Sequence, residues 1–496
     1  MADGGLMEIF LKKIGIVKES RIALDGLTVI TGKNNSGKTT VGKTLYSLID
    51  AVSNLERKVA SDRRYYIYKQ LSEIEPVLDM LRIYFRGRRR DNDPALSETA
   101  LYNFFDRRYI HDRQGFTSID FEDFAHQLYT ELKSFDYQKI SLSDIEPYFK
   151  RSLRSRYEDK YSASEILQRQ IDEAIHILEG IFANLDKDPD FVEYAKESIA
   201  QTLHVEFSGQ IQPVREPEAS SEIRISDIES CFFDIKIKQN KIISPKDEKV
   251  YFASPYKRAY LIDDPFVVDR MSGIPYRSFR VSDYSEINTV FNSGRIETHN
   301  ERLQRILHYN SGNTVLEKTI IEDALSIIRA RIDTILPGTI ELSEEGDYYI
   351  QNGMKLEISN LATGSKLFTI VKMLLEKGEL DRSTMLILDE PESHLHPQWQ
   401  NAFAEIIVLL AKELGVKILL TTHSPNFMLA IDANMRKYSF ADKTNFYQTY
   451  VLSDGFVEYR CVNDNIEDIY SDFLQYLSEA KYLRDSYMFG TGTGEE

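Results

Sequence analysis

The chain has 496 residues, 42% of them apolar, and a formal net charge of −17 at pH 7. This length and apolar content allow a large buried core and predict two or three structural units. The negative charge argues against a protein that coats nucleic acid without sequence preference, because that mode of binding depends on clustered lysine and arginine.

The number of cysteines and the hydropathy of the chain indicate the cellular compartment in which the protein is expected. The two cysteines, Cys231 and Cys461, are too few for a disulfide framework, so we expect both to be packing residues in a reducing environment. No apolar stretch approaches the roughly 20 residues that span a bilayer, and the N-terminus lacks the features of a secretory signal. We therefore expect a soluble, cytoplasmic protein that has no membrane partner.

Residues 1 to 51 are predicted to be the N-terminal lobe of an α/β domain. Met7 to Ile14 and Arg21 to Leu24 are expected to be strands, and the β-branched run Leu27 to Thr31 a buried one. Val41 to Ala51 has apolar residues at helical spacing. Between strand and helix the chain reads Gly-Lys-Asn-Asn-Ser-Gly-Lys-Thr, which is the P-loop pattern in the context that this motif requires.

The P-loop predicts a site for a nucleoside triphosphate. Its glycines allow backbone N–H groups to surround the phosphates, and the following helix adds the positive end of its dipole. Lys38 is expected to reach the β- and γ-phosphates, and Thr39 to place its hydroxyl on Mg²⁺. We therefore predict ATP and Mg²⁺ as cofactors. The predicted phosphate-binding residues are Gly32, Asn34, Asn35, Ser36, Gly37, Lys38, Thr39 and Thr40.

Residues 52 to 203 are predicted to form an inserted helical arm. Apolar residues recur at helical spacing from Ile67 to Leu81 and from Leu167 to Phe182, but sustained heptads are missing, which argues against a long coiled coil. Between Arg82 and Arg113 eight arginines stand against five acids. This basic cluster is either a solvated face or a docking surface for DNA or for an acidic protein. A second basic cluster contains Lys150, Arg151, Arg154 and Arg156.

The region from 204 to 298 is predicted to be the β-rich part of the head. Cys231 to Ile237 alternates from Phe233 onward, and Gln239-Asn240 offers a turn to a strand at Lys241 to Ile243. Lys249 to Ala253 is expected to be a further strand.

Residues 299 to 496 are predicted to be the C-terminal lobe. Its expected elements, in chain order, are a helix from Val315 to Leu336, a hairpin that turns at Asn352-Gly353, a hairpin that turns at Asp454-Gly455, and a helix from Ile466 to Leu477.

A second part of the nucleotide site is predicted within this lobe. Met385 to Leu388 is an apolar, central-strand pattern that ends in Asp389, whose carboxylate is expected to hold Mg²⁺ together with Thr39. Neighbouring side chains on a strand face opposite ways, so Glu390 can leave the metal and meet the attacking water as general base. If Glu390 is not the base, Glu392 is the next candidate.

Three segments carry a resemblance to a known family: Asn360 to Lys366 (Asn-Leu-Ala-Thr-Gly-Ser-Lys), Leu388 to Pro397, and Thr421 to Pro425 (Thr-Thr-His-Ser-Pro). They resemble the signature, the Walker B with D-loop, and the switch-histidine segments of ABC-type ATPase heads. The branch is the soluble one that contains the OLD-like, Rad-type repair and SMC-like proteins. Within it the chain is most similar to the AAA15 ATPases, which are ATPase subunits of bacterial anti-phage systems such as PARIS and Septu.

The resemblance implies an α/β fold, namely an ABC-ATPase head with a mixed sheet, a P-loop core and an antiparallel β subdomain. From Lys38 to Gly364 there are 326 positions, far more than a transporter head uses, which leaves room for a large inserted helical arm. The resemblance also implies that heads pair, so that ATP on one P-loop is covered by the signature segment of the other. The signature residues that would then contact ATP are Thr363, Gly364, Ser365 and Lys366.

By the same matching, Glu390 is the base, His423 the γ-phosphate sensor, and Ser393 to His396 the segment that crosses between heads. Ala362 departs from the family, because transporter heads carry a serine there that contacts the γ-phosphate. Which neighbour replaces that serine stays open, and no glutamine matching the Q-loop can be identified.

Two functions follow as hypotheses. The first is a sensor and scaffold of an anti-phage complex, a homo-oligomer whose nucleotide state holds or releases a separate effector, expected to be a nuclease. Its trigger would be an acidic phage protein bound at the cluster between Arg82 and Arg113. Only 73 residues follow His423, so we expect no nuclease domain of the OLD type in this chain. The second is a DNA-repair or DNA-clamping ATPase in which the basic clusters contact phosphates, and a third is an ATP-gated interaction module without a toxic partner.

Overall fold

A computed structural model describes residues 7–53, 55–74, 121–134, 163–243, 254–273, 297–308, 322–343 and 346–488. The chain divides into two compact units. The first comprises Met1–Leu55, Val192–Ser278 and Ile296–Glu496, and the second Glu56–Phe191 and Phe279–Arg295. The basic clusters at 82–113 and 150–156 and the strand predicted for Lys249 to Ala253 lie outside the described residues.

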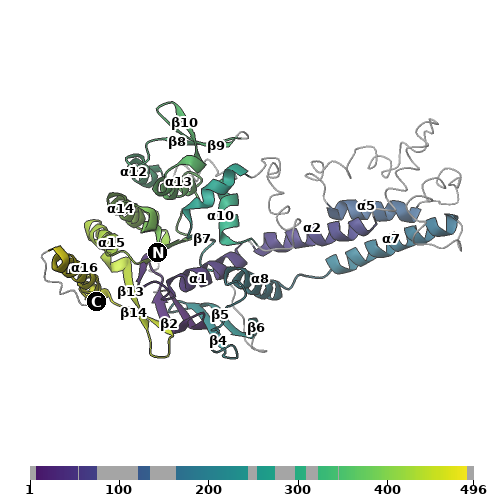
Figure 1. Cartoon of the computed structure of the whole chain (residues 1–496). Helices are drawn as coiled ribbons and strands as arrows, with labels where there is room; N and C mark the ends of the chain where they lie inside the picture. Colours follow the sequence, from purple (N-terminus) through teal and green to yellow (C-terminus); the bar gives the residue numbers. More distant parts are fainter. Residues whose placement is uncertain are drawn as a thin grey trace. The chain divides into compact units, whose positions relative to one another are not determined.

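The first unit is built on a mixed sheet of eleven strands in the order β6-β5-β4-β1-β2-β14-β13-β3-β12-β11-β7 (Figure 1). One end of the sheet is antiparallel and the other is parallel. The antiparallel end contains β1 (Glu8–Ile14), β2 (Val17–Ala23), β4 (Ser221–Ser226), β5 (Cys231–Lys238) and β6 (Lys241–Ile243). The parallel end contains β3 (Leu27–Thr31), β7 (Arg258–Ile262), β11 (Thr384–Asp389) and β12 (Lys417–Thr422). Between them lie β13 (Thr444–Val451) and β14 (Val457–Cys461), which form a hairpin.

Helices cover both faces of the parallel strands, so side chains alternate between two cores. On β11, Leu386 and Leu388 enter one core, whereas Met385 and Ile387 enter the other. The first core lies under α13 (Thr363–Glu376), α14 (Pro397–Glu413) and α15 (Pro425–Lys437), and the second under α1 (Lys38–Val52) and α8 (Phe191–Glu206) (Figure 1). Burial on both faces explains why these strands are almost wholly apolar in sequence.

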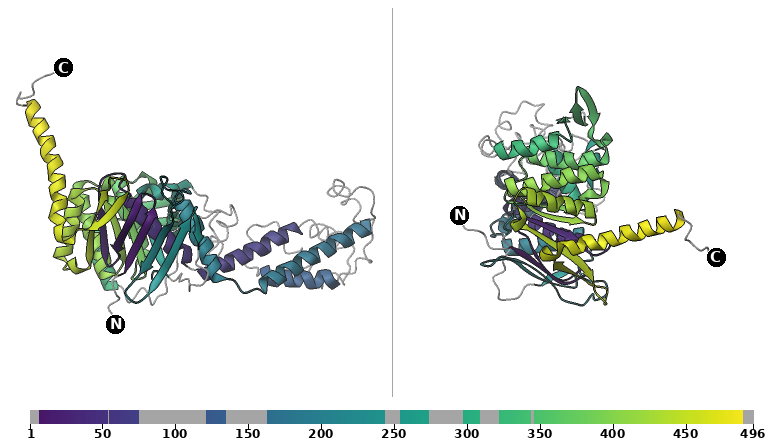
Figure 2. Two further views of the ribbon diagram at one scale, coloured as in Figure 1. Left: turned by 90° about the horizontal axis from the view of Figure 1, so that it is seen from below. Right: turned by 90° about the vertical axis from the view of Figure 1, so that its left-hand side faces the viewer.

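Smaller elements complete the first unit. A separate antiparallel sheet contains β8 (Thr339–Ser343), β9 (Gly346–Gln351) and β10 (Met354–Glu357). Further helices are α10 (His299–His308), α12 (Glu322–Asp333) and α16 (Ile466–Met488). Short 3₁₀ turns are η5 (Pro265–Gly273), η7 (Ile358–Asn360), η8 (Pro391–His394), η9 (Ala441–Lys443) and η10 (Asn463–Asn465). Figure 2 shows α16, which follows β14 and η10 in the chain, projecting from the rest of the first unit.

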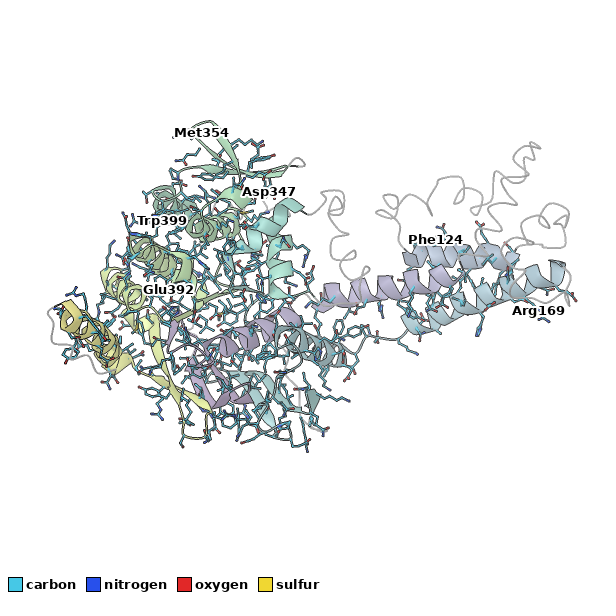
Figure 3. All side chains as sticks on the ribbon, viewed as in Figure 1. Phe124, Arg169, Asp347, Met354, Glu392 and Trp399 are labelled. Carbon is cyan, nitrogen blue, oxygen red and sulfur yellow. The ribbon has the colours of Figure 1, made fainter. Side chains whose placement is uncertain are left out.

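The second unit is helical where it is described, with α2 (Leu55–Glu73), α5 (Phe121–Ser134) and α7 (Ala163–Leu185). α5 packs on α7 through aromatic contacts, since the ring of His126 stacks on Phe182 with centroids 4.1 Å apart. Tyr129 meets the same ring edge-on and donates a hydrogen bond of 2.9 Å to Glu179. Phe124 of α5 and Arg169 of α7 mark the two helices in Figure 3.

The α/β class and the mixed sheet predicted from the sequence are confirmed. The strand predicted for Leu27 to Thr31 and the turn at Gln239-Asn240 are confirmed as well. The domain boundaries stay a prediction; α8, which the predicted arm included as far as residue 203, lies in the first unit. Cys461 is exposed near the end of β14, so the expectation that it is a packing residue is wrong. No described helix is both long and apolar enough to span a bilayer.

Candidate functional site

The P-loop connects β3 to α1 at the parallel end of the sheet. Asn35 (φ 61°) and Gly37 (φ 77°) adopt the left-handed backbone conformation that turns the loop into the helix. The Ser36 hydroxyl, which is buried, donates to the carbonyl of Lys33 at 2.6 Å and holds the loop in this shape. The first turn of α1 has no side-chain cap, so its backbone N–H groups are available to an anion.

Lys38 is buried, and its ammonium group has three partners. It donates to the carbonyls of Gly32 at 3.1 Å and Lys33 at 2.9 Å, and it lies 3.0 Å from Oε1 of Glu390. One lysine therefore bridges the P-loop and the strand end that carries the predicted base.

Asp389 ends β11, and two hydroxyl groups hold its carboxylate. Thr39 donates to Oδ2 at 2.6 Å, and Thr421 of the neighbouring strand β12 donates to Oδ1. Burial and the nearby charge of Glu390 raise the pKa of Asp389, while the two hydrogen bonds oppose this rise. A cation beside this carboxylate would relieve the cost of its burial. The pair of hydroxyl and carboxylate oxygens suits Mg²⁺, which prefers oxygen ligands and few protein groups.

Glu390 has an unusual backbone. Its φ of 50° and ψ of 49° are left-handed, a conformation that is uncommon outside glycine and clusters at functional sites. Its N–H donates to the carbonyl and hydroxyl of Thr421, each at 3.1 Å. Its side chain lies between two others, because Oε1 is 3.0 Å from Lys38 and Oε2 is 3.2 Å from Nδ1 of His423.

Glu392 occupies a different environment, close to α14 (Figure 3). It is 2% exposed, and its Oε1 accepts hydrogen bonds from the hydroxyl of Thr422 at 2.6 Å and from the backbone N–H of His423 at 3.1 Å. Burial raises the pKa of this carboxyl against the effect of its hydrogen bonds. Glu392 therefore holds the segment that contains His423 through hydrogen bonds. Because its side chain is buried, it is poorly placed to take a proton from water.

A cavity of about 740 Å³ gathers most of the predicted residues. It is lined by the P-loop and helix start Asn34 to Thr40, by Asp389 and Glu390, and by residues that the sequence analysis did not assign, Gly15, Ile16, Phe207, Ile262, Asp263, Pro265 and Leu367. Pro391, Ser393, His394 and Leu395 line its remaining side. Its volume is within the range of small-molecule sites. Gly32 and His423 are not lining residues, although His423 contacts Glu390.

The signature segment forms the start of α13 and does not line this cavity. Ala362 is exposed and Thr363 half-buried, whereas Gly364, Ser365 and Lys366 are buried. Lys366 donates to Asp269 at 2.6 Å and to the carbonyl of Ser359 at 2.9 Å. A Cβ on Gly364 would come within 2.9 Å of the Trp399 ring, so this glycine also has a packing role.

Two residues of the β13–β14 hairpin support the P-loop and were not foreseen. Tyr459 donates from its buried hydroxyl to the carbonyl of Gly37 at 2.5 Å, and burial raises the pKa of that hydroxyl. A Cβ on Gly32 would collide with the side chain of Thr449. No local pattern marks these contacts, because they join strands more than 400 positions apart in the chain. Asp263, by contrast, follows an apolar strand, which is the signal that identified Asp389.

The donor set fits a nucleotide with a bound cation. A lysine, exposed loop N–H groups and a hydroxyl–carboxylate pair lie together in one cavity. Within the described part of the chain no group of three or more His, Cys, Asp and Glu side chains is arranged to bind a metal without other ligands. A cation held by Thr39 and Asp389 would thus need phosphate and water oxygens as well.

Comparison with known proteins gives three findings. The model of the AAA_15 family, described as an AAA ATPase domain, matches residues 15–428. The Old nuclease of Escherichia phage P2 is 30% identical over 112 residues, which are 22% of this chain and only 17% of that protein. Among solved structures, the SMC head domain from Thermotoga maritima aligns with a TM-score of 0.31 at 12% identity, over 92% of this chain and 99% of that one. The Smc head domain with a coiled coil and joint from Pyrococcus yayanosii aligns with a TM-score of 0.32 at 11% identity, over 96% and 99%.

Proposed function

This chain belongs to the AAA_15 family of AAA ATPase domains, and we propose that it hydrolyses Mg²⁺-ATP in the P-loop cavity and uses nucleotide-dependent pairing of heads to control a partner protein. The observation that carries the hydrolytic part is the convergence of Lys38, Asp389 and Glu390 on one cavity. A cavity that merely bound nucleotide would not need a strained glutamate next to the metal carboxylate.

Each residue has a proposed role. The backbone from Gly32 to Gly37 and the side chain of Lys38 hold the phosphates, while Thr39 and Asp389 hold Mg²⁺. The cation supplies charge neutralisation to the phosphate oxygens when it is bound. Glu390 accepts the proton of the attacking water, and His423, 3.2 Å away, holds the glutamate in position and senses the γ-phosphate.

The ion pair between Lys38 and Glu390 suggests how the base is controlled. While Lys38 lies 3.0 Å from Oε1 of Glu390, it occupies one oxygen of the proposed base. When Lys38 turns to phosphate oxygens, Glu390 loses this partner, and its Oε1 is free to accept a hydrogen bond from the attacking water. We propose that the exchange limits proton abstraction to the loaded site.

Pairing of heads is the second part of the proposal. The first turn of α13 begins at an exposed Ala362 without a side-chain cap, so its N–H groups can meet the γ-phosphate of a second copy. Thr363 is the half-buried hydroxyl at this position and is the best substitute for the missing signature serine, whereas the ammonium group of Lys366 is already bound to Asp269. ATP between the two heads would stabilise the pair, and hydrolysis would release it.

We propose that this cycle serves as the sensor and scaffold of an anti-phage defence complex whose effector is a separate nuclease. Two observations support the proposal: membership of the AAA_15 family and the local likeness to the Old nuclease of a phage. The arginines between 82 and 113 are the proposed dock for an acidic phage protein. Replacement of Arg88, Arg89 and Arg90 by glutamate would abolish triggering and leave hydrolysis intact.

The competing function is a DNA-repair or DNA-clamping ATPase. The same basic clusters favour it, because lysine and arginine side chains would contact DNA phosphates. It predicts DNA binding that weakens by about a thousandfold between 50 and 200 mM salt if six or more phosphates are contacted.

Steady-state ATP hydrolysis by the purified chain separates these functions, with Glu390→Gln as the blank and linear duplex DNA present or absent at two salt concentrations. Slow hydrolysis whose rate does not change when DNA is added supports the sensor and scaffold function. Strong, salt-sensitive stimulation by DNA supports the clamp. Wild-type turnover equal to that of the blank would contradict both.

A further inference from the structure

Asp263 stands beside Asp389 at the carboxyl end of the parallel strands. β7 pairs with β11 so that Ile262 lies opposite Leu388, and the next residues of the two strands, Asp263 and Asp389, therefore leave the sheet side by side. Both carboxylates line the P-loop cavity. Asp263, which directly follows β7, thus lies at the same edge of the sheet as Asp389, the proposed metal ligand at the end of β11.

A histidine contacts the carboxylate of Asp263. Nε2 of His299, at the start of α10, lies 3.0 Å from Oδ1 of Asp263, and the amide of Asn300 donates to the same oxygen at 3.3 Å. The other ring nitrogen of His299 lies 2.6 Å from Oε2 of Glu206, and the backbone N–H of His299 donates to Oε1 of Glu206 at 2.9 Å. The imidazole is thereby fixed between two carboxylates.

The protonation of this clamp follows from its partners. Burial works to lower the pKa of His299, but the hydrogen bonds and charges of Asp263 and Glu206 outweigh it and raise that pKa to about 9. The imidazole is therefore a cation at neutral pH with a carboxylate at each ring nitrogen.

The two carboxylates around His299 differ in their access to the cavity. The Glu206 side chain is 1% exposed, as expected for a structural partner, whereas the Asp263 side chain is 25% exposed. Both contacts to Asp263 described above use Oδ1. An ion pair with only a structural role would not need a carboxylate that lines the nucleotide cavity.

We propose that Asp263 is a further positioning residue of the ATPase site, which accepts hydrogen bonds from water bound around the Mg²⁺ of Asp389, and that His299 and Glu206 fix its orientation. This proposal rests on the proposed ATPase function. Mg²⁺ loses its water ligands reluctantly and keeps several of them in protein sites, so a carboxylate one water away from the metal can orient the hydrated ion. Asp263 is not a second base, because the His299 cation lowers the pKa of its carboxyl against the effect of burial.

The test compares four proteins: wild type, Asp263→Asn, His299→Gln and the double variant, with Asp227→Asn as a matched control. Asp227 is also an aspartate whose Oδ1 has two partners, the backbone N–H groups of Glu229 and Ser230, but it does not line the cavity. Each protein is titrated with a fluorescent ATP analogue with and without Mg²⁺, and the Mg²⁺ concentration for half-maximal hydrolysis is measured. Thermal unfolding is recorded in parallel.

We expect Asp263→Asn to bind the analogue normally without Mg²⁺, to lose about tenfold of the affinity gained with Mg²⁺, and to need correspondingly more Mg²⁺ for hydrolysis. His299→Gln shifts the same quantities in the same direction. The double variant is no worse than Asp263→Asn, because His299 acts through Asp263.

The proposal is overturned if Asp263→Asn shows the Mg²⁺ dependence of the wild type, or if its loss of activity follows only a lower unfolding temperature. It is also overturned if the two single effects add. Failure of the wild type itself to bind or hydrolyse ATP would instead refute the proposed function, and the wild-type titration distinguishes the two failures.

Discussion

The P-loop cavity and the start of α13 are the two regions that the sequence analysis assigned to ATP, and their surroundings differ. At the cavity, polar side chains from the start of α1 and from the ends of β11 and β12 contact one another within hydrogen-bonding distance. At the start of α13, the buried signature residues Ser365 and Lys366 face inward, and the exposed Ala362 and half-buried Thr363 are what the segment offers to a partner. The small sheet that precedes this segment ends in a fully exposed β10, whose Met354 is marked in Figure 3.

This difference in surroundings indicates that the two regions have different partners. We propose that the cavity supplies the groups for phosphate, cation and water from one chain. The start of α13, which does not line this cavity, would offer its backbone N–H groups to a second copy. If the comparison is right, substitutions in the cavity should impair hydrolysis or binding, and substitutions at the start of α13 should impair pairing alone.

The largest expected effect is that of Glu390→Gln. Removal of the proposed base should lower turnover by about a thousandfold, within the range for general-base catalysis, while ATP binding persists and the closed pair accumulates. Single-turnover hydrolysis and size-exclusion chromatography with ATP measure the two effects. Turnover at the wild-type rate would show that another group is the base; the burial of Glu392 makes that residue a poor candidate.

Lys38→Ala should lower ATP affinity by about a hundredfold, because the lysine is the cationic contact to the terminal phosphates. Fluorescence titration with an ATP analogue measures this loss. Lys412→Ala, which removes an exposed lysine on α14, is the control and should bind as the wild type does. If Lys38→Ala bound ATP as tightly as the wild type, the proposal that ATP binds in this cavity would be contradicted.

Ala362→Arg separates the two regions most directly. A bulky charged side chain at the exposed start of α13 should prevent ATP-dependent pairing, yet leave the affinity for ATP within about twofold of the wild type. Analytical ultracentrifugation of the Glu390→Gln background, with and without Ala362→Arg, gives the readout. Gly364 is less suitable for this test, because any side chain there meets Trp399 within the same chain. If the Ala362→Arg variant still pairs in the presence of ATP, the proposal that this segment contacts the ATP of a second copy is contradicted.

Glu392→Ala should lower the free energy of unfolding by about 3 kcal/mol, because it leaves the Thr422 hydroxyl and the His423 N–H without their buried acceptor. Glu392→Gln retains an acceptor oxygen and should lose less. Denaturant unfolding measures both. Equal loss in the two variants would mean that side-chain volume, rather than the hydrogen bonds, stabilises the His423 segment.

The smallest effect is a pH dependence of stability from His299. Its folded pKa of about 9 exceeds the ordinary value of 6.5, so its contribution is complete below pH 6.5 and is lost as pH rises through 9. Between pH 7 and 9 the wild type should lose about 2 kcal/mol from this group, and His299→Gln should lack that loss. Unfolding curves at four pH values test the difference, and parallel pH dependences in the two proteins would contradict the raised pKa.

Elements whose signals are local were predictable from the sequence. The strand Leu27 to Thr31, the P-loop and the strand that ends at Asp389 were identified because each has a short, continuous pattern of apolar or special residues. Burial on both faces of the parallel strands produces such patterns. The strand predicted around Arg21 to Leu24 was found too short, since β2 begins at Val17 in an antiparallel region where polar residues alternate with apolar ones.

Contacts made by distant parts of the chain were decided only by the tertiary structure. The sequence by itself predicted a phosphate loop, a metal carboxylate and a candidate base, because the pattern of each depends on neighbours within a few positions. It could not determine that Tyr459 supports Gly37, that Glu392 holds the His423 segment, or that Asp263 lies beside Asp389. Those arrangements depend on which strands are adjacent in the sheet, and strand order results from packing of the whole unit rather than from any local pattern.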